Sequence, residues 1–315
     1  MTMSVHLARL LVLAVIFVNG WTDAPGAIAT AVGSGAMSFR KSVWMAAACN
    51  FIGAAAACLC FPAVADTIGE LVAFSSPRAA VTALNAALLS IVLWAVAAWR
   101  FGLPTSESHA LLAGLSGGAL ALGVGAAQPS AGAWLRALSG LALSLPAGMA
   151  AGRLFRRLLA GRVRRPAAWQ RAGAALTALL HGVQDGQKFM ALLLLTGGLG
   201  GEQPASRLSL ALLTAAVMAL GTALGGKPIV EKMGTELANL TPAEGLSADL
   251  GAGVVLLVCS ALGLPVSTTH AKVSAICGAG RGADRRVMGQ MAVAWALTFP
   301  VCGGVAFALT RLMMG

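Results

Sequence analysis

The sequence predicts an all-α polytopic membrane protein that consists of two inverted-topology repeats, with broken helices and two re-entrant hairpins. Composition predicts the class, because 58% of the 315 residues are hydrophobic and 10% are charged, whereas a soluble domain has roughly 25% charged residues. One motif that occurs twice predicts the repeats. It reads GLPTSESH at residues 102–109 (the first turn) and GLPVSTTH at residues 263–270 (the second turn).

A second pair of motifs has the same spacing to within one residue. NGWTDAPG contains Asp23, and HGVQDGQK contains Asp185. Two unrelated landmarks that share one offset indicate an internal duplication. We therefore divide the chain into a first transmembrane repeat (1–152) and a second, inverted transmembrane repeat (171–315).

The residues between the repeats form the strongest basic cluster. Segment 153–170 contains RLFRRLLAGRVRRP, and the formal net charge of the chain is +11. Its arginines lie between apolar runs, which is the pattern of cytoplasmic loops under the positive-inside rule. We expect a basic cytoplasmic linker and no nucleic-acid partner. The segment could also touch anionic membrane lipid, although orientation alone explains the charge.

Apolar stretches in the first repeat are judged against the roughly 20 residues that a membrane-spanning helix needs. They cover residues 8–38, 43–64, 79–101, 110–127 and 131–151. GWTDAPG interrupts the first of them, and we expect the helix to break there.

Apolar stretches in the second repeat are shorter around the turn. They cover residues 171–200, 207–225, 250–262, 271–280 and 287–313. HGVQDGQK interrupts the first, so we expect a second break there, followed by a loop at GEQPAS. The two stretches that flank the second turn are too short to cross roughly 30 Å at 1.5 Å per residue. They suggest a re-entrant hairpin, whose backbone persists at membrane depth only where protein buries it or water lines it.

The basic cluster orients the chain. With residues 153–165 on the cytoplasmic side, the predicted spans place both termini on the non-cytoplasmic side, and one hairpin enters from each face. This is the inverted-repeat plan of secondary transporters, which have their site near the midplane. We expect a multi-pass protein of the plasma or inner membrane.

The two turns contain six hydroxyl side chains. These are Thr105, Ser106, Ser108, Ser267, Thr268 and Thr269. Hydroxyls and free N–H groups at helix starts suit a tetrahedral oxyanion, which needs many donors and the positive end of a helix dipole. Ser and Thr also cap helices after a Gly-Pro turn. Because two matched turns occur in opposed repeats, we favour anion binding.

Asp23 and Asp185 are the second set of candidate site residues. A carboxylate within an apolar span is costly and by default marks a functional site. Each aspartate lies where glycine is expected to break the helix and free carbonyl groups to share a cation, and each could also cap the half-helix that follows. Since a carboxylate repels an anion unless a cation or proton is present, this arrangement predicts symport.

The histidines have two interpretations each. His109 and His270 end the two turns and either relay protons or orient their hairpins. The same alternatives apply to His181.

Three cationic side chains are also candidates. Lys188 either neutralises the aspartate beside it or meets the anion. Lys272 either faces the membrane or belongs to the site. Arg100 either meets an anion or snorkels toward the interface.

Enzymatic signatures are absent from the sequence. It contains no P-loop, zinc signature or nucleophile elbow, and its six cysteines have no ligand spacing. We expect no enzyme and no cofactor besides the coupling ion. An intramembrane enzyme that uses Asp23 and Asp185 as an acid–base pair is disfavoured, because we expect both aspartates in helix breaks at matching positions of the two repeats.

Both turns, both aspartate motifs and the segment GKPIVEKMGTELANLTPAEGLSADLG resemble the inorganic phosphate transporter (PiT) family over nearly the whole chain. The resemblance implies an inverted-repeat symporter that carries inorganic phosphate with Na⁺ or H⁺, and it makes a homodimer plausible. It also implies a site formed by the aspartates and the turn hydroxyls, here Asp23, Asp185, Ser106, Ser108, Ser267, Thr268 and Thr269.

The chain departs from the family pattern at four places. Thr22 and Gln184 precede the aspartates where the family usually has Asn, Gly26 replaces a further Asn, and Glu107 replaces a small hydroxyl residue. Fewer amide ligands would weaken Na⁺ coordination, and the added carboxylate could hold a proton instead. The residues expected to hold the coupling cation or proton are Thr22, Asp23, Glu107, Gln184 and Asp185, and the two aspartates would be metal ligands only if that cation is Na⁺.

The expected function is therefore secondary active transport of inorganic phosphate with alternating access. The departures could also retune the anion, so a sulfate permease on the same scaffold is an alternative. An anion channel is a further alternative from another class.

Overall fold

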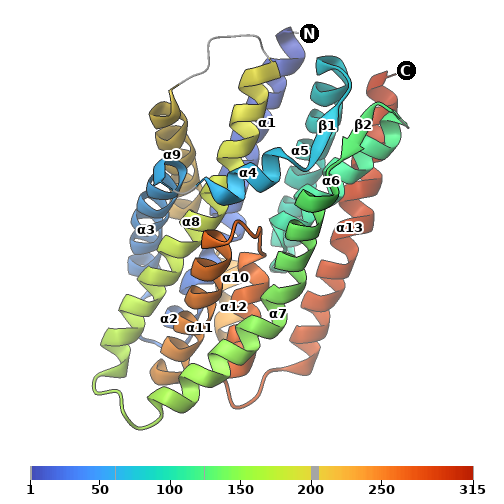
Figure 1. Ribbon diagram of the computed structural model, residues 1–315. Helices are drawn as coiled ribbons and strands as arrows, with labels where there is room; N and C mark the ends of the chain where they lie inside the picture. The colour runs from blue at the N-terminus through green and yellow to red at the C-terminus, as the bar shows by residue number, and fades with distance from the viewer. Residues whose placement is uncertain (1, 61, 124, 200–205, 315) are drawn as a thin grey trace.

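The computed structural model describes residues 2–60, 62–123, 125–199 and 206–314, and it is mainly helical (Figure 1). The first half of the chain forms α1 (Thr2–Thr22), a 3-10 helix η1 (Ala24–Ile28), α2 (Ala29–Gly33), α3 (Phe39–Cys60), α4 (Ala63–Gly69), strand β1 (Val72–Phe74), α5 (Pro77–Arg100), α6 (Glu107–Leu122), strand β2 (Ala127–Pro129) and α7 (Ala131–Leu159). The second half forms α8 (Pro166–Leu199), α9 (Arg207–Leu224), α10 (Lys227–Glu231), a π-helical turn η2 (Lys232–Glu236), α11 (Pro242–Ala261), α12 (Thr268–Ala279) and α13 (Arg285–Met314). The loop expected at GEQPAS lies outside the described residues except for Ser206.

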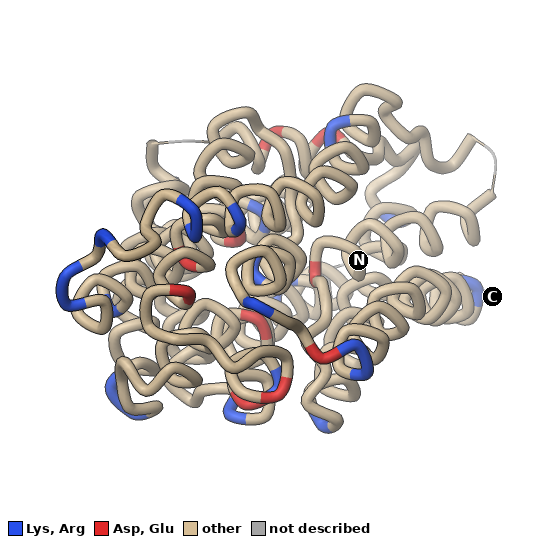
Figure 2. The backbone as a smooth tube through the Cα atoms, turned by 90° about the horizontal axis from the view of Figure 1, so that it is seen from below, with Lys and Arg blue, Asp and Glu red and all other residues tan. Residues whose placement is uncertain are grey.

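Both termini lie at one end of the molecule, and basic loops lie at the other (Figure 1). The loops at 160–165 and 280–284 belong to this second end, and Figure 2 looks onto it and shows Lys and Arg on its loops. Helices α7 and α8 extend into the basic segment 153–170, so the connection that is not helical covers only residues 160–165. We call this end the basic end.

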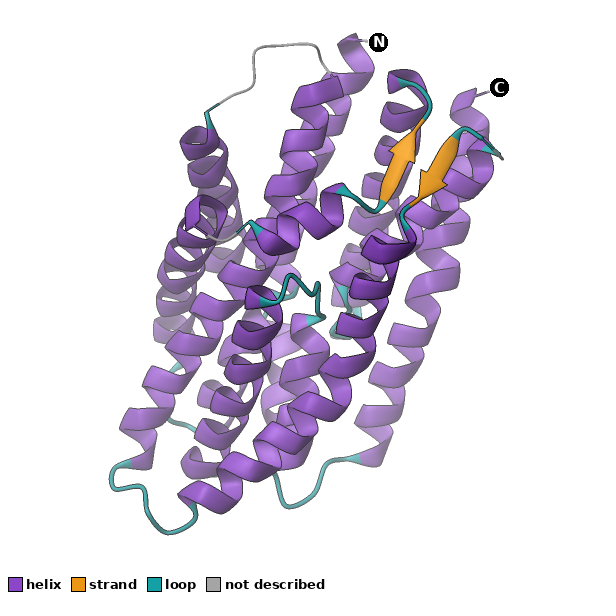
Figure 3. Ribbon diagram, viewed as in Figure 1, coloured by secondary structure: helices purple, strands orange, loops and turns teal. Residues whose placement is uncertain are grey.

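A short two-stranded sheet lies at the end that carries the termini (Figure 3). Strands β1 and β2 are antiparallel, with Val72 opposite Pro129 and Phe74 opposite Ala127. The all-α prediction is wrong in this detail. Three-residue strands have no alternation long enough to detect in a sequence, and the pairing joins segments that lie far apart in the chain.

The long helices have the composition of a membrane protein. Seven of the described helices are long and apolar enough to cross a membrane. In α5 and α11, 67% and 72% of the most apolar window is buried, whereas in α13 the share is 22%. The helices that lead into the two turns therefore lie inside the bundle, and α13 lies at its periphery.

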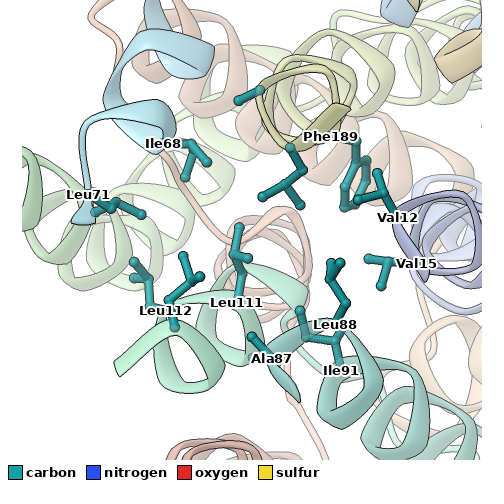
Figure 4. Close-up of a cluster of buried hydrophobic side chains, with 14 of the residues drawn as sticks. Val12, Val15, Ile68, Leu71, Ala87, Leu88, Ile91, Leu111, Leu112 and Phe189 are labelled. Carbon is teal, nitrogen blue, oxygen red and sulfur yellow. The ribbon is translucent and has the colours of Figure 1, made fainter. Parts of the chain in front are cut away.

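The interior is built from apolar side chains of both halves. Figure 4 shows Val12 and Val15 of α1 together with Leu88 of α5, Leu111 of α6 and Phe189 of α8. Among the helix pairs in contact, α3 packs on α8 and α9 on α1, while α13 packs on α6 and α12 on α7. The two halves of the sequence thus form one interlocked bundle.

The expected break at Asp23 is present, whereas the expected break at HGVQDGQK is not. Helix α1 ends at Thr22, and η1 begins with Ala24 and Pro25, where proline lacks the N–H group that would continue the helix. Helix α8 runs through HGVQDGQK without interruption. Its glycines serve close packing instead, since a Cβ on Gly182 would overlap the carbonyl oxygen of Asn50. The prediction that Asp185 stands beside freed carbonyl groups is therefore wrong.

The helix before the second turn is longer than expected. The sequence suggested a short arm at 250–262, but α11 begins at Pro242. Thr241 caps it in a capping box with Glu244, and the helix passes through Asp249, whose buried carboxylate pairs with Lys272. Only the arm after the turn, α12, is as short as predicted.

The close contact between α3 and α8 can be tested with a glycine substitution. In the Gly53→Ala variant, the new methyl group would overlap the carbonyl oxygen of Leu179 where α3 crosses α8. We expect this overpacking to lower the free energy of unfolding by about 1–3 kcal/mol, measured as a lower Tm in detergent. Gly289→Ala is the matched control, because its methyl group meets no atom within 4 Å. Equal Tm values for the two variants would contradict this close packing of α3 on α8.

Candidate functional site

The first and second turns meet inside the bundle. The Ser108 hydroxyl donates a hydrogen bond to the carbonyl oxygen of Val266 at 2.9 Å. The rings of His109 and His270 lie 4.6 Å apart between centroids, and the Trp295 indole N–H donates to the carbonyl oxygen of Pro104 at 2.9 Å. The structure therefore brings together the two turns that the sequence repeats.

Each turn has the same local construction. Gly102 and Gly263 have φ angles of 64° and 67°, a left-handed conformation that favours glycine. Ser106 and Ser267 are the N-caps of α6 and α12, and each hydroxyl accepts a hydrogen bond from the backbone N–H three residues later. These two hydroxyls thus act as helix caps, which was the alternative interpretation.

Asp23 is bound by the second turn. The Thr268 hydroxyl donates to Asp23 Oδ2 at 2.8 Å, and the Thr269 hydroxyl donates to Oδ1. All three residues are buried. The break after α1 therefore faces the start of α12, and it joins the two halves of the chain.

Asp185 lies on the face of α8 that points into the site. His181, Asp185 and Lys188 are four and three residues apart, which places them on one side of a continuous helix. The Lys188 ammonium lies 2.6 Å from Asp185 Oδ1, and His181 Nε2 lies 3.4 Å from Oδ2. The uninterrupted helix thus presents one carboxylate, one ammonium and one imidazole together.

Lys188 also contacts both turns. Its ammonium donates to the hydroxyl of Ser108 and to the carbonyl oxygen of Val266, each at 2.7 Å. With Asp185, these groups use the three donors of the ammonium. Of the two sequence interpretations, neutralisation of the neighbouring aspartate is the one visible in these contacts.

Glu107 and Asn19 complete the site. The Asn19 amide donates to Asp185 Oδ2 at 2.9 Å and to Glu107 Oε2, and the Thr22 hydroxyl lies 3.2 Å from Glu107 Oε1. Asn19 is not among the site residues predicted from the sequence. It could have been noticed as a polar residue one helical turn before Asp23 in an otherwise apolar run.

His181 links two carboxylates. Its Nδ1 donates to Asn50 Oδ1 at 3.1 Å, so Nε2 faces Asp23 and Asp185 at 3.8 and 3.4 Å. A lone pair opposite two carboxylates is repulsive, so this nitrogen needs a proton or a cation between it and the oxygens. His181 is therefore part of the site, although the sequence did not favour a site role for it over a structural one.

Two predicted residues lie elsewhere. Gln184 points to the end of α11, where its amide donates to the carbonyl oxygen of Leu264 at 3.1 Å and its oxygen accepts from Ser260. Because α8 continues as a helix, Gln184 is turned away from Asp185 by about 100°. Arg100 is exposed at the end of α5. Thr105 is buried in the first turn.

A second buried polar cluster surrounds Lys272. Its ammonium pairs with Asp249 of α11 and donates to the carbonyl oxygen of Ala27 at 3.0 Å. The Thr30 hydroxyl donates to Asp249 Oδ1 at 2.6 Å. Lys272 is 3% exposed, so the interpretation that it faces the membrane is wrong. This cluster joins α12 to η1, α2 and α11.

The site is suited to a cation. Among the described residues, the carboxylates of Asp23, Asp185 and Glu107 meet here opposite the ammonium of Lys188. Three carboxylates against one ammonium leave an excess of negative charge unless a proton or cation is present. Ligand atoms of Asp23, His181 and Asp185 all lie within 4.8 Å of one another, and the buried Asn19 Oδ1 has no partner among the described residues. Oxygen ligands of this kind suit hard cations.

The space between the second turn and Asp23 is small. A cavity of about 10 Å³ is lined by Asp23, Thr177, His181, Thr269 and Lys272, among others. Such a volume holds about one water molecule. A tetrahedral oxyanion would therefore require the surrounding elements to move apart.

A family model and several known proteins match this chain over most of its length. The model of the phosphate transporter family matches residues 19–171 and 162–306. A "probable low-affinity inorganic phosphate transporter" of Bacillus subtilis is 30% identical and covers 96% of this chain and 95% of its own length. A protein of the same name from Rhizobium meliloti is 33% identical over 90% of this chain and 89% of its own.

One solved structure has the same fold. It is titled "The sodium-dependent phosphate transporter", and it superposes with a TM-score of 0.85 over 99% of both chains. The sequences are 20% identical, so this likeness concerns the fold alone.

The Asp249–Lys272 pair generates a stability prediction. Lys272→Met leaves the Asp249 carboxylate buried without its ammonium, and we expect the free energy of unfolding to fall by about 3–5 kcal/mol. The double variant Asp249→Asn/Lys272→Met removes both charges and should recover most of the loss. Tm in detergent measures both effects.

The exposed pair Lys227–Glu231, 3.6 Å apart, is the control. Lys227→Met should change stability by less than about 1 kcal/mol, because water already solvates both charges. A double variant as unstable as Lys272→Met would show that the ion pair does not account for the loss.

Proposed function

Because the chain belongs to the phosphate transporter family, we propose that it is a secondary active symporter, which moves inorganic phosphate across the cell membrane together with H⁺ or Na⁺. Its membership of a transporter family confirms the expectation that it is not an enzyme. The observation that carries the proposal is the meeting of three buried carboxylates with hydroxyl groups of the second turn and, through the Lys188 ammonium, with Ser108 of the first turn. Asp23 already accepts hydrogen bonds from Thr268 and Thr269.

Charge balance supports coupling. Phosphate is an anion and would be repelled by Asp23, Asp185 and Glu107 if the cluster kept its excess negative charge. A cation bound among these carboxylates lowers that repulsion, so anion and cation favour each other's binding, which is the thermodynamic basis of coupling between two sites. Na⁺ could use the oxygens of Asn19, Asp23 and Asp185, whereas a proton could reside on Glu107 or His181.

Paired helix contacts support an inverted repeat. If α1 is exchanged with α8 and α3 with α9, the contact of α3 with α8 becomes that of α9 with α1. If α6 is exchanged with α12 and α7 with α13, the contact of α6 with α13 becomes that of α12 with α7. All four contacts occur. Hairpins α5–α6 and α11–α12 then open toward opposite ends, as Figure 1 allows the reader to follow.

Alternating access would use the contacts between the hairpins. Lys188 holds both turns, through Ser108 and Val266, and Asp23 holds only the second turn, through Thr268. Release of the contacts of Ser108 would open the site toward one face while Thr268 stays bound to Asp23, and release of Val266 and Thr268 would open it toward the other face. The small cavity beside Asp23 fits a closed arrangement.

The orientation of the chain in the membrane follows from the positive charge of the basic end. We place the loops at 160–165 and 280–284 in the cytoplasm according to the positive-inside rule. Both termini would then lie on the opposite side, because they lie at the other end of the bundle. The membrane concerned is the plasma or inner membrane.

The direct test is uptake of labelled phosphate into proteoliposomes under separate Na⁺ and H⁺ gradients. Asp23→Asn and Asp185→Asn each remove a charge that binds a hydroxyl, an ammonium or the coupling cation. A contact with a charged group is worth about 1.5–3 kcal/mol, so we expect gradient-driven uptake to fall roughly tenfold to a hundredfold.

Asp66→Asn is the control, because Asp66 is exposed on α4. Uptake by both site variants at the wild-type rate would refute the site. Competition by sulfate but not by unlabelled phosphate would assign the substrate to sulfate.

Glu107 gives a pH prediction. If Glu107 carries the coupling proton, wild-type uptake falls as pH rises, because the carboxyl loses the proton that offsets the anion's charge. Glu107→Gln keeps the size and hydrogen-bonding ability of the side chain but cannot titrate, so its uptake should lose this pH slope. The rate is measured across a pH series with Na⁺ held constant. An unchanged slope in Glu107→Gln would exclude Glu107 as the proton carrier.

A further inference from the structure

Two hollows flank the first turns of α11 at the basic end. One, of about 510 Å³, lies between the end of α7, the start of α11 and Arg281. The other, of about 570 Å³, lies between the 162–164 loop, α8 and α11. Leu159 lines both of them. The two hollows are therefore neighbours beside the start of α11.

The first hollow is basic. Arg156, Arg157 and Arg281 line it, against the single carboxylate of Glu244 among its described lining residues. Arg281 pairs with Glu244 at 3.1 Å, and Arg156 donates to the carbonyl oxygen of Gly280 at 2.7 Å. Arg157 is exposed. Guanidinium groups bind phosphate oxygens through paired hydrogen bonds, so this hollow suits a phosphate group.

The second hollow is apolar with a basic rim. Its lining includes the aliphatic residues Leu159, Val163, Leu176, Leu246 and Leu250. Arg162, Arg164, Trp169, Ala172 and Gly173 complete the lining. Trp169 is 61% exposed, as is usual for tryptophan at the level of lipid headgroups.

The apolar surface continues from this hollow along α11. This helix packs between α7 and α8, and its exposed side carries Val254, Leu257 and Val258 beyond the hollow. An apolar strip thus runs from the arginines toward the second turn. A free phosphate ion or an acidic soluble protein would use the arginines but not the strip.

We propose that this region binds an anionic phospholipid. The headgroup phosphate lies against Arg157 and Arg281, and one acyl chain lies along α11 past Leu246 and Leu250. Clusters of basic residues beside membrane helices attract anionic headgroups, and the strip adds apolar contact that distinguishes a lipid from a soluble anion. The site lies outside the carboxylate cluster and uses none of its residues.

The location gives the lipid a means to influence the carboxylate cluster. Helix α11 carries Asp249, whose carboxylate pairs with Lys272, and it leads directly into the second turn. A lipid held against the start of α11 restrains the hairpin that contains Thr268 and Thr269. This consequence for transport rests on the proposed function, whereas lipid binding itself does not.

Native mass spectrometry of the full-length protein tests binding. The probes are phosphatidylglycerol and phosphatidylcholine with identical acyl chains, and inorganic phosphate in a separate titration. We expect phosphatidylglycerol to bind the wild type in preference to phosphatidylcholine. In Arg157→Gln/Arg281→Gln, two charges near the headgroup are lost, so its affinity should fall about thirtyfold.

The control is Arg40→Gln/Lys41→Gln, which removes two exposed basic residues of the chain that line neither hollow. It should retain phosphatidylglycerol as the wild type does. An equal loss in the control, equal binding of the two lipids, or saturation of the site by inorganic phosphate would each overturn the proposal.

Hydrogen exchange of the wild type provides a measurement that needs no variant. Residues 242–250 should exchange more slowly in nanodiscs with phosphatidylglycerol than in nanodiscs with phosphatidylcholine alone. Identical exchange in both membranes would refute the site even if the arginine variants failed to fold. Uptake assays in the same two lipids then show whether lipid binding affects transport, and a lack of coupled uptake in both lipids would count against the proposed function but not against lipid binding.

Discussion

The arrangement of the site depends on the ion pair between Lys188 and Asp185. A buried charge is costly unless an opposite charge and hydrogen bonds satisfy it, and Lys188 finds these partners on three segments. Its ammonium reaches Asp185 on its own helix, Ser108 in the first turn and the backbone of Val266 in the second turn. One side chain of α8 therefore holds the two turns against each other, because each of them supplies an oxygen that the buried ammonium needs.

The two halves share a packing plan but not a polar network. The helix of the first half breaks after Thr22, whereas α8 continues through the matching motif. Pro25 accounts for the difference, since HGVQDGQK contains no proline. The first turn contributes Glu107 to the site, and the second contributes Thr268 at the corresponding start of α12. Corresponding positions of the two halves thus carry different polar groups, a carboxylate at Glu107 and a hydroxyl group at Thr268.

Helix α11 connects the interior to the basic end. It begins with a capping box at Thr241 and Glu244, continues past the buried pair of Asp249 with Lys272, and ends at the second turn. Most of this helix lies inside the bundle, since 72% of its apolar window is buried. The two hollows lie at the start of α11, the Asp249–Lys272 pair lies along it, and the second turn with its contacts to Asp23 lies at its end.

The amino-acid sequence by itself determined the membrane class and the two repeated turns, and it singled out both aspartates as candidates, because composition and a repeated motif can be read from the chain without knowledge of its contacts. It could not decide whether glycines at Gly182 and Gly186 break a helix or allow another helix to approach, since the answer depends on Asn50 and Ala54 of α3. For the same reason the sequence did not favour Asn19 or His181 as site residues, whereas it did favour Gln184. Each is a polar residue in an apolar run. Only the direction in which its side chain points from the helix shows whether it meets Asp185 or the end of α11. The tertiary structure decided the role of these glycines and the direction of these polar side chains, because a buried polar group is stable only where a partner from elsewhere in the chain satisfies it.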